Sequence, residues 1–229
     1  MTSALLAFLT RLEHRPEVLV SGSAIGFYGI EDCGAIDESV GQGRGFAAEL
    51  CARWEAAARQ GEALGIRTIL LRTGIVLGNS GGMLASLLPI FEAGLGGPVG
   101  HGRQVMSWIH RDDLVRLIVA AVADVEIDGV LNATAPNPVS SRAFAAALGQ
   151  ALRRPANLPL PSAPLRLALG DLAEELLLGG QKVLPVKAVF HGFRFRYPRI
   201  EQALGDLVGH PAAHIPTPTR PFVEARLLH

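Results

Sequence analysis

The sequence predicts an α/β fold built on a largely parallel sheet, with a smaller region at the end of the chain. Short apolar runs rich in β-branched residues alternate with longer helical segments, as they do in strand–helix–strand units. The chain has 229 residues, of which 49% are hydrophobic, and its 21 basic and 21 acidic side chains balance. This length suits one large domain or two small ones.

The first predicted elements are a helix, a strand and a second helix. Leucines at helical spacing predict a helix over about residues 3–13, which Pro16 ends. The run "EVLVS", which begins at Glu17, predicts a short buried strand, and a polar, glycine-bearing loop follows it. An alanine-rich stretch from Phe46 predicts a strong helix that stops at Gly65.

The later predicted elements continue this alternation. The β-branched run "IRTILLRTGIVLG" predicts one strand buried on both faces. Helices are predicted in "LASLLPIFEAGLG", where Pro89 can introduce a kink, and in "RDDLVRLIVAAVAD". The strand "GVLNAT" and the serine-capped helix "SSRAFAAALGQALR" follow. Beyond Arg154 the prolines cluster, so we expect a small cap region at residues 155–208 and a flexible tail at 209–229.

Composition argues against several functional classes. The balanced charge disfavours a nucleic-acid binder, which would show a basic excess. No apolar run reaches the roughly 18 residues of a membrane span, and the first residues lack the basic leader and cleavage site of a signal peptide. Cys33 and Cys51 have no metal-ligand spacing, and the seven histidines contain no H-x-x-x-H, so we expect no metal site. A reduced, cytoplasmic protein fits these features.

The glycines after the first predicted strand do not form a phosphate-binding turn. A dinucleotide fingerprint is G-x-G-x-x-G between a strand and the start of a helix. The stretch "SGSAIGFYG" places Gly22, Gly26 and Gly29 at a different spacing, and a polar loop follows instead of a helix N-terminus. The glycines of "GNSGGM" and "GLGGPVGHGR" fail the same test, so the sequence shows no phosphate loop.

Several segments together resemble one protein family. They are "SGSAIGFYG", "LCARWEAAA", "LRTGIVLGNSGGML", "GLGGPVGHGRQVMSWIHRDDL", "LNATAPNPV" and "GQKVLPVKAVFHGFRF". From about Leu5 to Leu207 the chain closely resembles an atypical branch of the extended short-chain dehydrogenases/reductases, the NAD(P)-dependent epimerase/dehydratase-like proteins. Bacterial members of this branch are often labelled sugar-nucleotide epimerases or cell-division inhibitors.

This resemblance implies a Rossmann-like parallel sheet, a small C-terminal α+β cap and an NAD or NADP cofactor. In such proteins the phosphate-binding glycines lie several strands before the strand at Glu17. The chain resembles a member without its first third, and residues 1–154 correspond to the later part of the NAD(P)-binding domain. We expect this N-terminally truncated sheet to have an uncovered apolar edge that favours self-association. We also expect weak or no NAD(P) binding by this chain alone.

The catalytic positions are only partly filled. Ser23 stands where the resemblance puts the catalytic hydroxyl, although a small residue there also permits tight packing. Its usual partners are the Tyr and Lys of Y-x-x-x-K, often followed by a Glu four residues later. Anchoring on Glu55 puts Ala47 and Cys51 at the Tyr and Lys positions, and neither can replace a phenol or an ammonium group. Tyr28 is the remaining catalytic candidate, and its alternative role is structural.

The resemblance also implies binding positions. The strand end "LRTGIVLG" is similar to the one whose backbone touches the nicotinamide carboxamide, and Gly74 leaves room for a close approach. Arg103 suits a substrate anion, with a salt bridge as its alternative role. His110 either titrates near neutral pH or orders a loop. The full candidate sets are Ser21, Gly22, Thr73, Gly74 and Val76 for the cofactor, and Arg103, Trp108, His110 and Asn132 for the substrate.

Four other side chains are expected to be structural. Trp54 is assigned to the core, and Glu55 to an ion pair on its helix or a backbone contact. Asp112 and Asp113 are assigned to the cap of the following helix, whose N-terminal end favours negative charge.

Taken together, these features predict an epimerase-like NAD(P)-dependent oxidoreductase with an unidentified small-molecule substrate, for which a nucleotide sugar is one candidate class. The alternatives are a non-catalytic binding or regulatory protein and an inactive remnant of the family. The absent Tyr/Lys pair leaves enzyme activity open. Neither a nucleic acid nor a membrane is expected as a partner.

Overall fold

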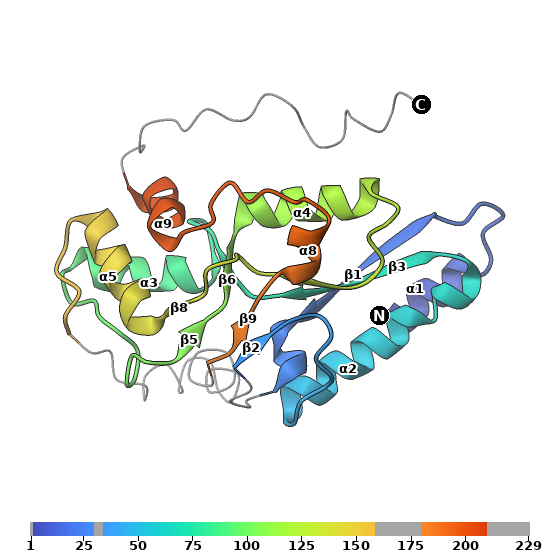
Figure 1. The fold of residues 1–229 in the computed structure, drawn as a ribbon, viewed down its shortest axis with the longest axis horizontal. Helices are drawn as coiled ribbons and strands as arrows, with labels where there is room; N and C mark the ends of the chain where they lie inside the picture. Colours follow the sequence, from blue (N-terminus) through green and yellow to red (C-terminus); the bar gives the residue numbers. More distant parts are fainter. Residues whose placement is uncertain (1, 30–33, 159–179, 210–229) are drawn as a thin grey trace.

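The computed structural model describes residues 2–29, 34–158 and 180–209 (Figure 1). Cys33, most of the proline cluster after Arg154 and the predicted tail beyond Gly209 lie outside these residues. The described elements are, in chain order, α1 (Thr2–Leu9), β1 (Val18–Ala24), η1 (Ile25–Tyr28), β2 (Ala35–Ile36), α2 (Phe46–Arg59), η2 (Glu62–Leu64), β3 (Arg67–Thr73), β4 (Ile75–Leu77), α3 (Gly82–Glu92), β5 (Val105–Met106), β6 (Trp108–His110), α4 (Arg111–Ala123), β7 (Gly129–Ala133), β8 (Val139–Ser140), α5 (Ser141–Leu152), β9 (Lys182–Val183), α8 (Val186–Phe190) and α9 (Ile200–Val208).

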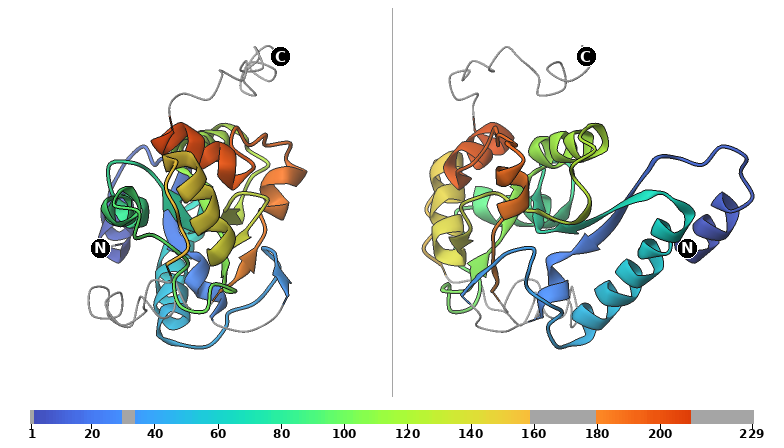
Figure 2. Two further views of the ribbon diagram at one scale, coloured as in Figure 1. Left: turned by 90° about the vertical axis from the view of Figure 1, so that its left-hand side faces the viewer. Right: turned by 45° about the vertical axis from the view of Figure 1, so that its right-hand side comes forward.

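The central sheet consists of three parallel strands in the order β1–β3–β7. Ile69 and Leu71 of β3 pack with α4 on one face. Leu19 of β1 packs with α1 on the opposite face, which α2 also contacts. Figure 1 shows α4 above the strands and α1 and α2 below them, and Figure 2 shows the same layers from two other sides. The predicted α/β fold with a Rossmann-like parallel sheet is therefore confirmed.

A second core lies beyond the carboxyl end of β3. Phe91 of α3, Trp108 of β6, Phe144 of α5 and Leu204 of α9 meet there. The last described helix, α9, packs along α5 (Figure 1). The helix α9 thus contributes side chains to the core that lies beyond the ends of the strands.

The run predicted as one strand at residues 66–78 is in fact two strands. Gly74 separates β3 from β4, and β4 pairs with β6 instead of continuing in the central sheet. The amide of Ile75 donates to the carbonyl of Ser107 at 2.8 Å, and a Cβ added at Gly74 would lie 2.6 Å from that carbonyl oxygen. The break occurs because another segment approaches so closely that only glycine fits, and the hydrophobic pattern carries no sign of that approach.

The two edges of the central sheet differ. On the β7 side, Glu38 accepts a hydrogen bond from the backbone of Asn132, and α8 packs against the strand. On the β1 side, none of the described residues pairs with the outer edge of the strand.

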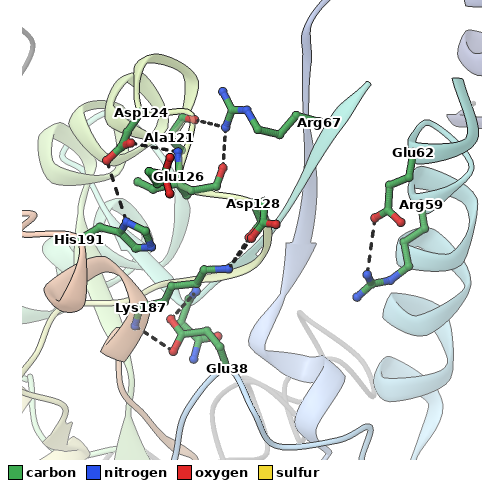
Figure 3. Close-up of polar contacts among 12 residues, drawn as sticks. Glu38, Arg59, Glu62, Arg67, Ala121, Asp124, Glu126, Asp128, Lys187 and His191 are labelled. Carbon is green, nitrogen blue, oxygen red and sulfur yellow. Dashed lines mark hydrogen bonds and ion pairs between the residues drawn. The ribbon is translucent and has the colours of Figure 1, made fainter. Parts of the chain in front are cut away.

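One arginine ties the start of β3 to the end of α4. The guanidinium of Arg67 donates to the carbonyl of Ala121 at 2.9 Å (Figure 3). It also donates to the carbonyl of Val122 at 2.8 Å. These carbonyls belong to the last turn of α4, which lacks further helical partners and carries partial negative charge. Arg67 therefore fixes how α4 lies across the sheet.

Candidate functional site

Three polar side chains lie next to one another near the carboxyl end of the central sheet. The strand register pairs Ser23 of β1 with Arg72 of β3, and Arg72 with Asn132 of β7. Because paired residues on neighbouring parallel strands share a face, all three side chains point the same way. Ser23 is 8%, Arg72 3% and Asn132 0% exposed. We call Ser23, Arg72 and Asn132 the polar row.

Glu55 of α2 binds two members of the polar row. Arg72 Nε donates to Glu55 Oε1 and Arg72 Nη2 donates to Oε2, both at 2.8 Å. Ser23 Oγ donates to the same Oε1, also at 2.8 Å. The expected ion pair of Glu55 exists, but its partner is a buried arginine of the sheet and not a residue on its own helix.

The charge of Arg72 is enclosed by aromatic rings. Its Cζ lies 3.4 Å from the centre of the Phe27 ring and 4.8 Å from that of Tyr28, which gives favourable cation–π contacts. Burial by itself lowers the pKa of Arg72, but the hydrogen bonds and charge interactions with Glu55 and Tyr28 together more than offset this and leave the pKa raised. Nη1 of Arg72 is buried and has no hydrogen-bond partner among the described residues. The guanidinium is therefore a permanent buried charge that one carboxylate neutralises.

Tyr28 lies beside the polar row, and its hydroxyl is engaged inside the protein. Its OH donates to Asn132 Oδ1 at 2.8 Å, and the residue is 3% exposed. Burial raises the pKa of Tyr28 above its usual value, although the neighbouring Arg72 acts in the opposite direction. The backbone at Tyr28 is closely packed, because a Cβ at Gly43 would collide with the Tyr28 carbonyl. Tyr28 thus remains a phenol that donates to Asn132.

Asn132 joins the polar row to distant parts of the chain. Its Nδ2 donates to the carbonyl of Leu184 at 3.0 Å, and its backbone N–H donates to Glu38 Oε1 at 3.0 Å. The second oxygen of Glu38 accepts from the backbone N–H of Lys187 at 3.2 Å (Figure 3). Lys187 Nζ in turn lies 3.1 Å from Asp128 Oδ1. The loop before α2 and the segment before α8 therefore close the β7 side of the row.

The α2 face that looks at the polar row carries the positions left open by the missing catalytic pair. Ala47, Cys51 and Glu55 are each separated by four residues, and all three are buried. Burial raises the pKa of the Cys51 thiol, so it stays uncharged. The assignment of Trp54 to the core is wrong, because turning Glu55 toward the sheet turns its neighbour outward, where Trp54 is 47% exposed.

The residues expected to bind the cofactor lie on two different elements. Ser21 and Gly22 are on β1, where Gly22 is exposed and an added Cβ would meet nothing within 4 Å. Thr73 ends β3 and Val76 lies within β4, both half-buried. The space at Gly74 is taken by the backbone of Ser107 rather than left open, and the Gly74 amide donates to the carbonyl of Ala133 at 3.1 Å.

The described residues do not fit the diphosphate of a dinucleotide. Such a group needs free backbone N–H groups at a helix that follows a strand through a G-x-G-x-x-G turn. The strands β1, β3 and β7 lead into η1, β4 and a loop to β8, respectively. A glycine-rich turn does precede α3, but its glycines stand at 78, 81 and 82, which is a different spacing.

Of the residues expected to bind the substrate, only Asn132 belongs to the polar row. Trp108 is 1% exposed in the second core, and its Nε1 donates to the carbonyl of Asn137 at 3.0 Å. Arg103 is exposed, and it makes no ion pair with any residue that the structure describes. Its alternative role as a salt-bridge partner finds no support within those residues.

His110 is buried at the start of α4. Its Nδ1 accepts from the backbone N–H of Asp112 at 3.0 Å and so caps the helix. The ring stacks on Tyr197 at 3.9 Å between centres, and the Tyr197 OH donates to Asp206 Oδ1 at 2.7 Å. His110 Nε2 lies 3.3 Å from Asp206 Oδ2, but not in a hydrogen-bonding direction. Burial lowers the pKa of His110.

Asp112 and Asp113 lie in the first turn of α4, as expected, but neither of them is its cap. His110 is the cap, and the side chain of Asp112 pairs with Arg111. Asp113 is fully buried and accepts hydrogen bonds from the backbone N–H groups of Arg196 at 2.9 Å and Tyr197 at 2.8 Å. Asp113 thus serves as the buried acceptor for the backbone of residues 196–197. The local sequence around α4 gives no indication of this contact. We call His110, Asp113, Tyr197 and Asp206 the His110 cluster.

A small apolar hollow lies in the second core, and Ser141 is the one polar side chain among its lining residues. Its lining residues come from α3, α5 and the segment between them: Met83, Leu87, Phe91, Gly97, Val99, Met106, Ser141 and Phe144. None of them belongs to the polar row. The hollow is therefore separate in composition from the polar candidate site.

Arg72 and the role of Glu38 were not predicted from the sequence. Arg72 stands inside an apolar, β-branched run that is expected to be buried on both faces. A charge in such a strand must have a buried partner of opposite sign. That rule leads from Arg72 to Glu55, but it needs the alignment of α2 against β3, which the sequence does not provide.

Comparison with known proteins adds relatives to this geometry. Residues 160–207 match a domain of unknown function, DUF1731. The chain is 45% identical to the "Epimerase family protein SDR39U1 homolog, chloroplastic" of Arabidopsis thaliana, over 84% of this chain and 55% of that protein. It therefore spans little more than half the length of this curated relative.

Two solved structures share the fold at substantial sequence identity. The human epimerase family protein SDR39U1 was crystallised with NADPH and is 34% identical, with a TM-score of 0.84 over 90% of this chain and 70% of that one. The nucleoside-diphosphate sugar epimerase of Corynebacterium glutamicum is 32% identical, with a TM-score of 0.73 over 91% of this chain and 41% of that one.

The described residues contain neither a membrane-spanning helix nor a cluster of metal ligands. No helix among them is long and apolar enough to cross a bilayer. Nor do three or more of their His, Cys, Asp and Glu side chains gather in a way that could hold a metal ion.

Proposed function

The chain belongs to the SDR39U1-type epimerase family, and from this premise we propose that it forms the reactant side of an NAD(P)-dependent oxidoreductase or epimerase site that acts on a nucleotide sugar. The human relative, crystallised with NADPH, supports the cofactor class. The printed name of the Corynebacterium glutamicum relative supports the substrate class.

The polar row is the observation that carries this proposal. Ligands of open α/β sheets bind outside the carboxyl ends of the strands. Ser23 stands at that end of β1, with its hydroxyl fixed by Glu55. A hydroxyl held in one direction by a buried ion pair suits the recognition of a substrate oxygen, because little orientation is lost on binding.

A cofactor titration tests the proposal. Calorimetry with NADPH is performed on residues 1–229 and on a chimera that carries the N-terminal segment of the human relative before Met1. We expect dissociation constants above about 1 mM for residues 1–229 and in the micromolar range for the chimera. Micromolar binding by residues 1–229 contradicts the expected weak binding, and no binding by the chimera contradicts the NAD(P)-dependent function.

Substrate class is tested by thermal shift of the same chimera. UDP-glucose, UDP-galactose and UDP-glucuronate are compared with UDP alone. A ligand at 100 times its dissociation constant stabilises a protein by about 2.7 kcal/mol, which is a clear shift. A stabilisation by UDP equal to that by all three sugars would remove the sugar from the proposal.

A second candidate is a non-catalytic binding or regulatory protein. Ala47 and Cys51 favour it, because a methyl group and an uncharged thiol occupy the positions of the usual phenol and ammonium groups. Turnover separates the two candidates. A chimera that binds NADPH and a sugar nucleotide but consumes neither over hours would favour the second.

We further propose that the protein is cytoplasmic and that two copies associate through the outer edge of β1. A seven-residue strand that no described residue pairs with on one side is a template for pairing. Gly22→Lys adds charge at an exposed position with free space, and Gly41→Lys is the matched loop control. Analytical ultracentrifugation should show a dimer that only Gly22→Lys weakens. A wild-type protein that stays monomeric over a 100-fold range of protein concentration would refute the association.

A further inference from the structure

The hydroxyl proton of Ser23 is already used inside the protein. Ser23 Oγ lies 2.8 Å from Glu55 Oε1 and donates to it. A serine hydroxyl has a single proton and two lone pairs, whereas an ionised carboxylate only accepts. When this bond is made, Ser23 has no proton left for a ligand, and only its lone pairs remain.

Arg72 keeps Glu55 in the accepting state. An arginine has five donor positions and no acceptor, so both of its contacts with Glu55 run from nitrogen to oxygen. The pair is bidentate and buried, with side chains 3% and 4% exposed. Phe27 covers the guanidinium from one side. Water therefore does not compete for these contacts, and the carboxylate receives three donors from Ser23 and Arg72.

Of these three residues, Ser23 is the one nearest to solvent. It is 8% exposed, and it stands one residue before the half-buried end of β1. A ligand that reaches the strand end thus meets an oxygen whose proton points inward. This is the opposite of a serine that donates to a carbonyl oxygen.

We propose that Ser23 reads a hydrogen-bond donor of the ligand, a hydroxyl or a protonated amine, and that Glu55 and Arg72 are the positioning residues that impose this preference. The placement of a ligand at Ser23 rests on the function proposed above. The orientation of the Ser23 hydroxyl does not, since it follows from the contacts within the chain. A ligand with a carbonyl or another acceptor-only group at this position binds less well.

The first arm of the test needs no ligand. The carboxyl carbon of Glu55 is observed by NMR in residues 1–229, in H₂O and in D₂O, and the isotope shift caused by its hydrogen-bond donors is measured. Ser23→Ala should reduce this shift, because it removes one of three donors. Trp54→Ala, an exposed change one residue away on α2, should leave it unchanged. An equal shift in wild type and Ser23→Ala would overturn the proposal.

The second arm uses a matched ligand pair. UDP-glucose and its 4-deoxy-4-fluoro analogue differ at one group, where fluorine accepts but cannot donate. Wild type should bind the fluoro analogue about tenfold more weakly. Glu55→Gln, which replaces one of the two accepting oxygens with an N–H donor while keeping the shape of the side chain, should reduce this ratio to about threefold or less. Trp54→Ala should retain the wild-type ratio.

The two arms separate two kinds of failure. Binding of both ligands with the same affinity by wild type overturns the donor preference. Loss of affinity for both ligands in Glu55→Gln, with the ratio kept, shows that Glu55 acts only structurally and overturns its positioning role. Binding of neither ligand, with the isotope shift intact, contradicts the proposed nucleotide-sugar function and leaves the orientation of Ser23 standing.

Discussion

The polar row with Glu55 and the His110 cluster each contain a buried charged group, but they hold different parts of the chain by different means. The first joins strands and a helix within the central layers, and its charges are an arginine and a carboxylate. The second fastens the segment that contains Arg196, Tyr197 and Asp206 to the start of α4. Its histidine is neutral when Nδ1 accepts from Asp112.

This difference indicates that the two clusters respond differently to conditions. An arginine keeps its charge at every pH at which proteins fold, so the Glu55–Arg72 pair is fixed. A histidine changes charge close to neutrality. Acid should therefore destabilise the packing of Tyr197 and α9 against the start of α4 before it disturbs the strand ends where Ser23 lies.

The largest expected effect comes from breaking the fixed pair. Arg72→Leu leaves the Glu55 carboxylate buried without its partner, which costs about 3–5 kcal/mol of unfolding free energy. Chemical denaturation measures the loss. The double variant Glu55→Leu/Arg72→Leu should recover much of it, because no unpaired charge remains. A loss below about 1 kcal/mol in the single variant would show that the pair is not a buried ionic contact.

The next effect concerns the permanent charge of the His110 cluster. Asp113→Asn removes the charge that accepts from the backbone of Arg196 and Tyr197 and from Arg116. Hydrogen bonds to charged groups contribute about 1.5–3 kcal/mol, so a loss of that order is expected. Asp112→Asn is the matched control, since its exposed contact with Arg111 contributes about 0–1 kcal/mol. Equal losses in both variants would contradict the difference in burial.

The smallest effect is the response to pH. Burial lowers the pKa of His110 below the ordinary histidine value of about 6.5. As the pH falls below 6.5, this residue therefore binds a proton more readily in the unfolded chain than in the folded protein. The neutral His110 therefore contributes its full share of the unfolding free energy above pH 6.5. This share is lost as the pH falls toward the pKa of His110 in the folded protein, by up to about 1.4 kcal/mol per pH unit. The groups facing the ring are Arg111, Asp112 and Asp113 on α4, together with Tyr197 and Asp206.

Hydrogen exchange locates this response. Between pH 7.5 and 5.5, after correction for intrinsic exchange, protection should fall in α9 and remain in β3. His110→Asn keeps a good capping residue without a titrating ring, so its α9 should lose the pH dependence. If α9 in that variant responds to pH as wild type does, another group is responsible.

The layers of the fold could be predicted from the sequence, but the contacts of the candidate site could not. The helices α2, α4 and α5 and the strands β1, β3 and β7 follow from local hydrophobic periodicity, glycine stops and the Ser140 cap. The break at Gly74 and the role of Asp113 depend on segments far away in the sequence. Local patterns do not encode such approaches.

The position of Ser23 was reached by resemblance, whereas its partners were not. The distance along the chain from Ser23 to Glu55 is 32 residues, and from Tyr28 to Asn132 it is 104. Such pairs require the strand register. A buried charge such as Arg72 is nevertheless a usable signal, because it demands an opposite charge somewhere in the fold.

The hydrogen bond between Asn132 and Leu184 has a consequence for the order in which contacts form during synthesis. The two residues are 52 positions apart, and Leu184 comes later. As the chain leaves the ribosome from its N-terminus, the three central strands are complete while the amide of Asn132 still lacks this acceptor. A chain cut short before residue 184 would possess the sheet and yet leave one end of the row of polar side chains open to water.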